Sequence, residues 1–140
     1  MSKTGRLILN YLGKVILDSS AFIALLDQET GWEAVSMVMN KSAMSSVNVS
    51  EVTKYLIDRR KYSMAEAQKI MEQLLDEIIP FTAEHAYIAA NFYPDTKTLG
   101  LSLGDRACLA LVSITGSTVY TADKVWSKIN IPKINIVVIR

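Results

Sequence analysis

The sequence predicts an α/β fold: one domain with a central parallel sheet of about four to five short strands, flanked by helices. Short apolar runs alternate along the chain with longer segments whose apolar residues repeat at helical spacing. Within each run the apolar residues are consecutive, which is typical of strands covered on both faces. The chain has 140 residues, half of them hydrophobic, which suits a single domain with its own core.

Each strand is predicted from an apolar run that stops at a polar or turn-forming residue. The first run, Val15-Ile16-Leu17, ends at Asp18. A later run contains Pro80, which we place near the strand end because proline cannot donate a ladder hydrogen bond. The strands predicted in this way cover residues 15–17, 43–45, 78–81, 119–121 and 136–139.

The helices are predicted from apolar residues at helical spacing and from residues that cap helix starts. Ser19 and Ser20 are predicted to cap the first helix, Ser63 and Thr82 lie at the start of later ones, and Ser102 begins a strongly apolar helix. The predicted helical segments are 21–27, 32–39, 52–59, 64–74, 82–90, 102–115 and 124–127.

A loop and an N-terminal extension are also predicted. Residues 93–101 are polar and contain Pro94 and Gly100, so a loop is predicted there. Residues 1–13 form an N-terminal extension of uncertain structure, and residues 14–140 form the predicted domain. The extension has a short apolar stretch after two basic residues, but no small-residue cleavage site of a signal peptide follows.

Composition excludes several classes of protein. The net charge is +1, which argues against binding of nucleic acid by bulk charge, although a local basic rim remains compatible with it. Cys108 is the only cysteine, so a zinc ribbon or a redox pair cannot form, and we interpret it as a small buried hydrophobe. No apolar run approaches the ~20 residues of a membrane span. A cytoplasmic protein is therefore predicted.

Four acidic residues lie where the strands and helices meet. Asp18 and Asp123 follow predicted strands, and Glu51 and Asp105 lie near helix starts. Each acid alone has a local explanation, as a helix cap or as a favourable charge at a helix start. Together they would meet at the carboxyl edge of a parallel sheet, where four like charges need a counter-charge. Mg²⁺ or Mn²⁺ would supply it, and such an ion can activate water against a phosphodiester.

The segments around these acids resemble the PIN-domain family, and within it the VapC toxins. The segments that carry the resemblance are Val15-Ile16-Leu17-Asp18-Ser19-Ser20, Asn48-Val49-Ser50-Glu51-Val52, Gly100-Leu101-Ser102-Leu103-Gly104-Asp105-Arg106 and Thr121-Ala122-Asp123. The resemblance implies a metal-dependent endoribonuclease that is the toxin of a toxin–antitoxin pair. Asp18, Glu51, Asp105 and Asp123 would then be the catalytic metal ligands.

The same resemblance suggests roles for the neighbouring residues and for partners. Ser19 and Thr121 match small hydroxyl positions beside the first and fourth acids and would orient them. Arg106 and Lys124 each follow a proposed ligand and are candidates for contacts with substrate phosphate. RNA would be the substrate, a small VapB-like antitoxin would block the site, and a homodimer is expected.

Two other functions remain open at this stage. The domain could be a non-catalytic module that binds a protein partner, or a small-molecule phosphatase that uses Asp18 as its nucleophile. The segment Gly100-Leu101-Ser102-Leu103-Gly104 matches a serine hydrolase elbow, but it follows a polar loop and the only histidine, His85, precedes it. We interpret His85 as a solvent-facing or hydrogen-bonded residue of an amphipathic helix.

Overall fold

The computed structural model describes residues 13–140 and contains one five-stranded sheet. All neighbouring strands are parallel, in the order β3-β2-β1-β4-β5. The strands are β1 (Val15–Leu17), β2 (Ser42–Ser45), β3 (Glu77–Ile79), β4 (Thr118–Thr121) and β5 (Ile136–Val138). The predicted α/β class and parallel sheet are confirmed.

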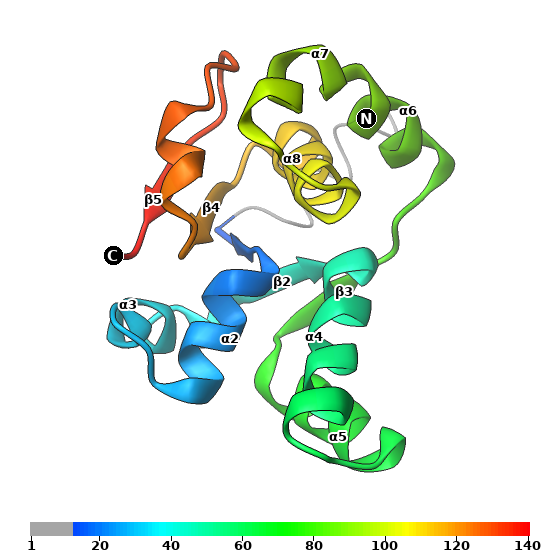
Figure 1. Ribbon diagram of the computed structural model, residues 1–140, viewed down its shortest axis with the longest axis vertical. Coiled ribbons are helices and arrows are strands. Elements are labelled where there is room, and N and C mark those ends of the chain that lie inside the picture. Colours follow the sequence, from blue (N-terminus) through cyan, green and yellow to red (C-terminus); the bar gives the residue numbers. More distant parts are fainter. Residues whose placement is uncertain (1–12) are drawn as a thin grey trace.

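Helices cover both faces of the sheet. Figure 1 shows α2 to α5 below the sheet and α6 to α8 above it. The helices are α2 (Ser19–Asp27), α3 (Trp32–Ser36), α4 (Ser46–Arg59), α5 (Met64–Leu74), α6 (Ala83–Asn91), α7 (Tyr93–Thr96) and α8 (Leu103–Thr115). Three short 3₁₀ turns join them: η1 (Met39–Lys41), η2 (Lys97–Leu99) and η3 (Lys124–Lys128).

The central strand β1 separates two hydrophobic cores. Val15 and Leu17 pack into the core beneath α2, α4 and α5, whereas Ile16 packs into the core beside α8. Successive side chains of a strand point to opposite faces, so this short strand serves both cores. All three residues are buried, which explains why the run is continuously apolar.

The predicted strands agree with the structure to within one or two residues. The first is reproduced residue for residue. The third is shorter than predicted, because it spans Glu77–Ile79 and stops before Pro80. Proline has no backbone N–H to donate to a neighbouring strand, so pairing stops before Pro80.

Two helix predictions are wrong in detail. The cap of α2 is Asp18, whose side chain accepts from the Ala21 amide at 2.8 Å, and the predicted caps Ser19 and Ser20 lie inside the helix. The predicted loop 93–101 contains α7 and η2 instead. Pro94 suits the first turn of α7 because its fixed φ is helical and its missing N–H has no intrahelical partner there.

His85 is neither solvent-facing nor fully hydrogen-bonded, contrary to our interpretation. Its side chain is buried in α6, and its ring packs edge-on against Phe81 with a centroid distance of 5.9 Å. Nδ1 has no hydrogen-bond partner among the residues that the structure describes. Burial lowers the pKa of His85, so the neutral ring is favoured.

The predicted N-terminal extension lies almost entirely outside the described residues, which begin at Gly13. Between residues 13 and 140, none of the helices is long and apolar enough to cross a bilayer. Cys108 is a free, buried cysteine as predicted.

Candidate active site

Asp18 lies at the point where the order of strands reverses. Its strand, β1, is flanked by β2 on one side and by β4 on the other. The Asp18 amide donates to the Tyr120 carbonyl at 3.1 Å, which extends the pairing of β1 and β4 to the carboxyl edge of the sheet. Ligand sites of open parallel sheets form at this kind of reversal.

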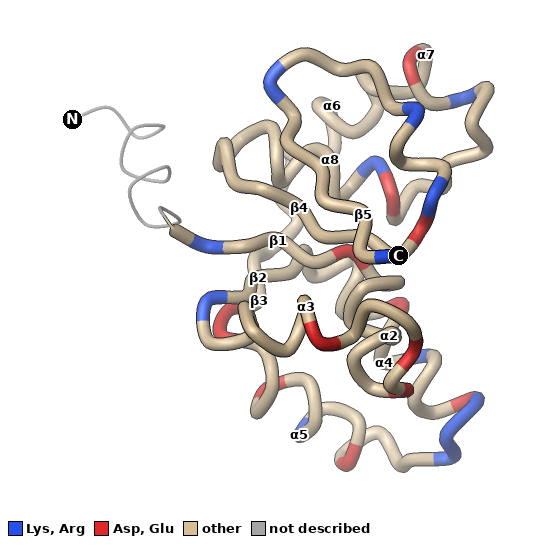
Figure 2. The backbone as a smooth tube through the Cα atoms, turned by 90° about the vertical axis from the view of Figure 1, so that its left-hand side faces the viewer, with Lys and Arg blue, Asp and Glu red and all other residues tan. Residues whose placement is uncertain are grey.

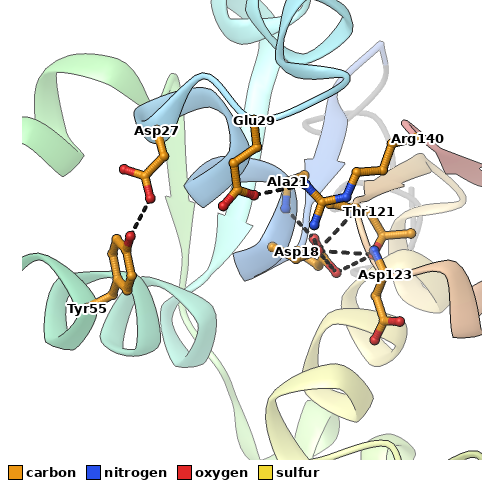
Figure 3. Close-up of polar contacts among 10 residues, drawn as sticks. Asp18, Ala21, Asp27, Glu29, Tyr55, Thr121, Asp123 and Arg140 are labelled. Carbon is orange, nitrogen blue, oxygen red and sulfur yellow. Dashed lines mark hydrogen bonds and ion pairs between the residues drawn. The ribbon is translucent and has the colours of Figure 1, made fainter. Parts of the chain in front are cut away.

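The Asp18 carboxylate is surrounded by donors (Figure 3). Thr121 donates from Oγ1 to Oδ2 at 2.5 Å, and the Ala21 amide donates to Oδ1 at 2.8 Å. The Ser20 hydroxyl lies 2.8 Å and 2.9 Å from the two carboxylate oxygens. Thr121 is 103 residues away in sequence, so this contact ties the end of β4 to the start of α2.

Asp18 is the most strongly perturbed acid of the site. Only 3% of its surface is exposed. Burial raises the pKa of Asp18 from 3.8 to about 6, although the hydrogen bonds from Thr121, Ala21 and Ser20 lower it, and the charge of Asp105 raises it further. A buried carboxylate that stays charged at neutral pH needs a nearby positive charge.

Glu51 is held from two directions although its residue is exposed. Ser19 donates from Oγ to Oε1 at 2.6 Å, and the Asn48 amide group donates to the same oxygen at 2.9 Å. Asn48 also donates to the Gly104 carbonyl at 3.0 Å, so one buried amide connects α4 with the first turn of α8. Because α4 begins at Ser46, Glu51 lies in the second turn of the helix, somewhat farther from the helix start than predicted.

Gly104 provides the space that the Glu51 carboxylate occupies. A Cβ at position 104 would lie 2.3 Å from Oε2 of Glu51, closer than real Cβ atoms approach other heavy atoms. The absence of a side chain at Gly104 lets Glu51 lie directly against the start of α8.

Asp105 is the acid that couples the other three. It forms the predicted capping box: the Ser102 amide donates to Oδ2 at 2.8 Å, and the Asp105 amide donates to the Ser102 hydroxyl at 3.2 Å. Burial raises the pKa of Asp105, the bonds with Ser102 lower it, and the charges of Glu51 and Asp123 raise it. Since the charge of Asp105 also raises the pKa of Asp18, all four predicted acids share one electrostatic environment.

Asp123 follows β4 and caps η3, as its local pattern suggested. Its Oδ1 accepts from the Val125 amide at 3.0 Å, and its own amide donates to the Thr121 hydroxyl at 3.0 Å. The carboxylate points away from Asp18 in Figure 3. The Thr121 hydroxyl thus forms hydrogen bonds with both the Asp18 side chain and the Asp123 backbone amide, and so links the residues that follow β1 and β4.

The donors suit a hard divalent cation in kind, because all four are carboxylates. As the side chains stand, no three acidic, histidine or cysteine residues within residues 13–140 are grouped closely enough to hold an ion. Asp105 and Asp123 accept instead from backbone amides at the starts of α8 and η3.

The hydroxyl and basic residues predicted beside the acids differ in their placement. Thr121 contacts Asp18, but Ser19 contacts Glu51 rather than the adjacent Asp18. Arg106 donates to the Leu101 carbonyl at 3.1 Å, and its guanidinium carbon lies 5.4 Å from the centroid of the Tyr93 ring. Lys124 is exposed at the start of η3, where its charge is available to a ligand.

Three residues of the site were missed from the sequence: Ser20, Asn48 and Gly104. Asn48 carried a usable signal, since a residue three positions before Glu51 on one helix lies on the same helical face. The contact between Gly104 and Glu51 joins residues far apart in the chain, and no local pattern indicates it.

The comparisons with known proteins concern both the family and the fold. A family model described as "PIN domain" matches residues 15–132. No protein of curated function matches the sequence.

Solved structures of low sequence identity share the fold. A toxin–antitoxin complex from Klebsiella pneumoniae contains a chain with a TM-score of 0.68 and 18% identity, covering 91% of this chain and 98% of that one. DNA-bound VapBC from Salmonella typhimurium gives 0.67 and 15%, with the same coverage. VapC20 from Mycobacterium tuberculosis, described as a sarcin–ricin loop cleaving toxin, gives 0.70 and 16%, covering 87% of this chain and 99% of that one.

Proposed function

Since the chain belongs to the PIN-domain family, we propose that it is a metal-dependent endoribonuclease and the toxin of a toxin–antitoxin pair. The observation that carries the proposal is the coupling of four carboxylates at the carboxyl edge of the sheet, with Asp18 buried among them. The likeness to structures described as VapBC and as a sarcin–ricin loop cleaving toxin supports the proposed substrate class.

In this proposal Asp18, Glu51, Asp105 and Asp123 hold Mg²⁺ or Mn²⁺. When bound, the ion would lower the pKa of a coordinated water and stabilise charge on the phosphodiester oxygens. Thr121 and Ser20 keep the Asp18 carboxylate in place, and Ser19 and Asn48 do the same for Glu51. Lys124, exposed beside Asp123, would contact a substrate phosphate, whereas Arg106 would have to leave the Leu101 carbonyl to do so.

The partners follow from the same likeness. We propose a VapB-like protein antitoxin that covers the acidic site, a homodimer of this chain, and action on RNA in the cytoplasm. Several structural neighbours are described as complexes of toxin and antitoxin. These complexes are the basis for expecting a protein inhibitor.

The test is cleavage of a mixed RNA pool in Mg²⁺ or Mn²⁺, with EDTA as one control. Asp18→Asn should abolish cleavage. Asp95→Asn, which changes an exposed aspartate on α7, should leave it unchanged. Cleavage that survives Asp18→Asn in a preparation free of contaminating nuclease would overturn the proposal.

A second function, a non-catalytic module that binds a protein partner, is favoured by one observation. Three of the four acids already bond to backbone amides at helix starts: Asp18 and Asp123 cap α2 and η3, and Asp105 completes the capping box of Ser102 at α8. If calorimetry detects no Mn²⁺ binding while a protein partner still binds, the acids are structural and this second function holds.

A further inference from the structure

A cavity of about 280 Å³ opens next to Glu51, between α2 and α4. The residues that line it are Ile23, Glu51, Lys54, Tyr55, Asp58 and Arg59. All but Ile23 lie on one face of α4, at spacings of three, four, seven and eight residues from Glu51. The cavity therefore continues the proposed active site along the helix for roughly 12 Å, from position 51 to position 59.

Its lining combines an aromatic ring, an aliphatic wall, two cations and the carboxylates of Glu51 and Asp58. The Tyr55 hydroxyl donates to the Asp27 carboxylate on α2, as Figure 3 shows, so the ring is fixed in orientation. Ile23 is partly buried and faces the same space from α2. Lys54 and Arg59 are exposed at the rim. A rigid ring with cations beside it is the arrangement that binds stacked bases and backbone phosphates of single-stranded nucleic acid.

The ion pair of Asp27 is formed with Arg60 and does not use Lys54 or Arg59, the two cations of the cavity. Arg60, rather than Arg59, pairs with Asp27 through Nε and one terminal nitrogen. Within the described part of the chain, Arg59 forms an ion pair only with the adjacent Asp58, at 3.6 Å, and both side chains are largely exposed. Such an exposed pair contributes little and is readily exchanged for a phosphate. Figure 2 shows Lys and Arg gathered where α4 leads into α5, beyond the far end of the cavity.

We propose that this cavity is a subsite for single-stranded RNA, in which a base next to the cleaved bond stacks on Tyr55 and the adjoining phosphates contact Lys54 and Arg59. The proposal rests on the proposed nuclease function, because Glu51 belongs to both sites.

The first measurement is the affinity of the full chain for a fluorescein-labelled single-stranded RNA oligonucleotide in EDTA, followed by anisotropy over a range of salt. Lys54→Ala and Arg59→Ala should each weaken binding and reduce the salt slope by about one. Tyr55→Leu should weaken binding at least about fivefold with an unchanged salt slope. Tyr55→Phe keeps the ring and should retain most of the affinity. Lys41→Ala, an exposed lysine at the opposite edge of the sheet, should have no effect.

The second measurement is cleavage kinetics in Mn²⁺, which separates the subsite from the nuclease function. Lys54→Ala and Arg59→Ala should raise KM and leave kcat nearly unchanged. RNA binding that depends on these residues without any cleavage by the wild type would refute the nuclease and keep the subsite. Cleavage with KM unchanged in both variants, or no RNA binding by the wild type, would overturn the subsite and leave the cavity to a protein partner.

Discussion

The carboxylate of Glu51 lies in the space that a side chain at Gly104 would fill, with Oε2 2.3 Å from the position of such a Cβ. The two residues belong to different helices, α4 and α8, and Asn48 bonds to both of them. Gly104 is followed by Asp105, so this contact sets how closely two of the four acids approach. A change at Gly104 should therefore alter the geometry of the site much more than the free energy of unfolding of the domain.

Replacing Gly104 with alanine should displace Glu51 without unfolding the protein. The conflicting atoms are the far end of a flexible side chain, and alanine favours helix, so the free energy of unfolding should stay within about 1 kcal/mol of the wild type. RNA cleavage should fall on the order of 100-fold, the effect of a displacement of about 1 Å in an active site. Thermal denaturation and cleavage rates measure the two effects.

Gly116→Ala is the matched control for this prediction. Gly116 ends α8 with φ +70° and has open space around it. Alanine there should cost about 1 kcal/mol of stability through backbone strain and leave cleavage unchanged. A Gly104→Ala variant with full activity would show that Glu51 does not need its present position.

Asp18 should destabilise the metal-free protein at neutral pH. Its folded-state pKa of about 6 exceeds the unfolded value of 3.8, so the folded state holds the extra proton between these values. The contribution of Asp18 to the free energy of unfolding therefore falls as pH rises from about 4 to about 6, by on the order of 3 kcal/mol. In EDTA at pH 7, Asp18→Asn should raise the melting temperature, and the gain should vanish near pH 4.

Asp95→Asn serves here too as the comparison, because this exposed aspartate should show no such gain. Added Mn²⁺ should stabilise the wild type and not the Asp18→Asn variant. A melting temperature that Asp18→Asn lowers at pH 7 would mean that the buried charge is already compensated.

Thr121 should keep Asp18 ionised toward lower pH. Its hydrogen bond lowers the pKa of Asp18, so Thr121→Val should raise that pKa and weaken Mn²⁺ binding more at pH 6 than at pH 8. Thr121→Ser retains the hydroxyl and should restore most of the affinity at both pH values. Calorimetry at the two pH values measures this, and an equal loss at both for Thr121→Val would indicate a structural effect alone.

His85 should produce the opposite pH trend. Burial lowers its pKa below 6.5, with Glu84 as the charged neighbour that opposes the shift. The stability contributed by the neutral ring is present above about 6.5 and is lost as pH falls. His85→Leu should therefore lose less stability than the wild type between pH 7 and pH 5. Denaturant unfolding at both pH values tests this, and parallel losses would contradict it.

The elements that the sequence predicted correctly are those with a local physical cause. Val15-Ile16-Leu17 is continuously apolar because both faces of β1 are covered, and Ser102 with Asp105 forms a capping box that any four-residue window reveals. The segment 93–101 was mispredicted because a proline in the first turn of a helix and a proline in a loop leave the same local signal.

The contacts between side chains of the candidate site were harder to predict than the positions of its four acids. The four acids were proposed as site residues because each follows a strand or lies near a helix start. Ser20 rather than Ser19 contacts Asp18, because successive residues of a helix are rotated by about 100°, so Ser19 faces Glu51 and Ser20 faces Asp18. Which serine faces which acid depends on how α2 packs against α4. No local pattern in a single sequence indicates that packing.

The pairing of β1 with β4 also bears on when the site forms during translation. Asp18 needs Tyr120 and Thr121 for its backbone and side-chain hydrogen bonds, and Asp123 follows them. A nascent chain that still holds β4 inside the ribosome contains Asp18, Glu51 and Asp105 but lacks the strand that completes their edge of the sheet. Truncated products that end before residue 118 lack it permanently, so the assembled site requires translation at least through Asp123.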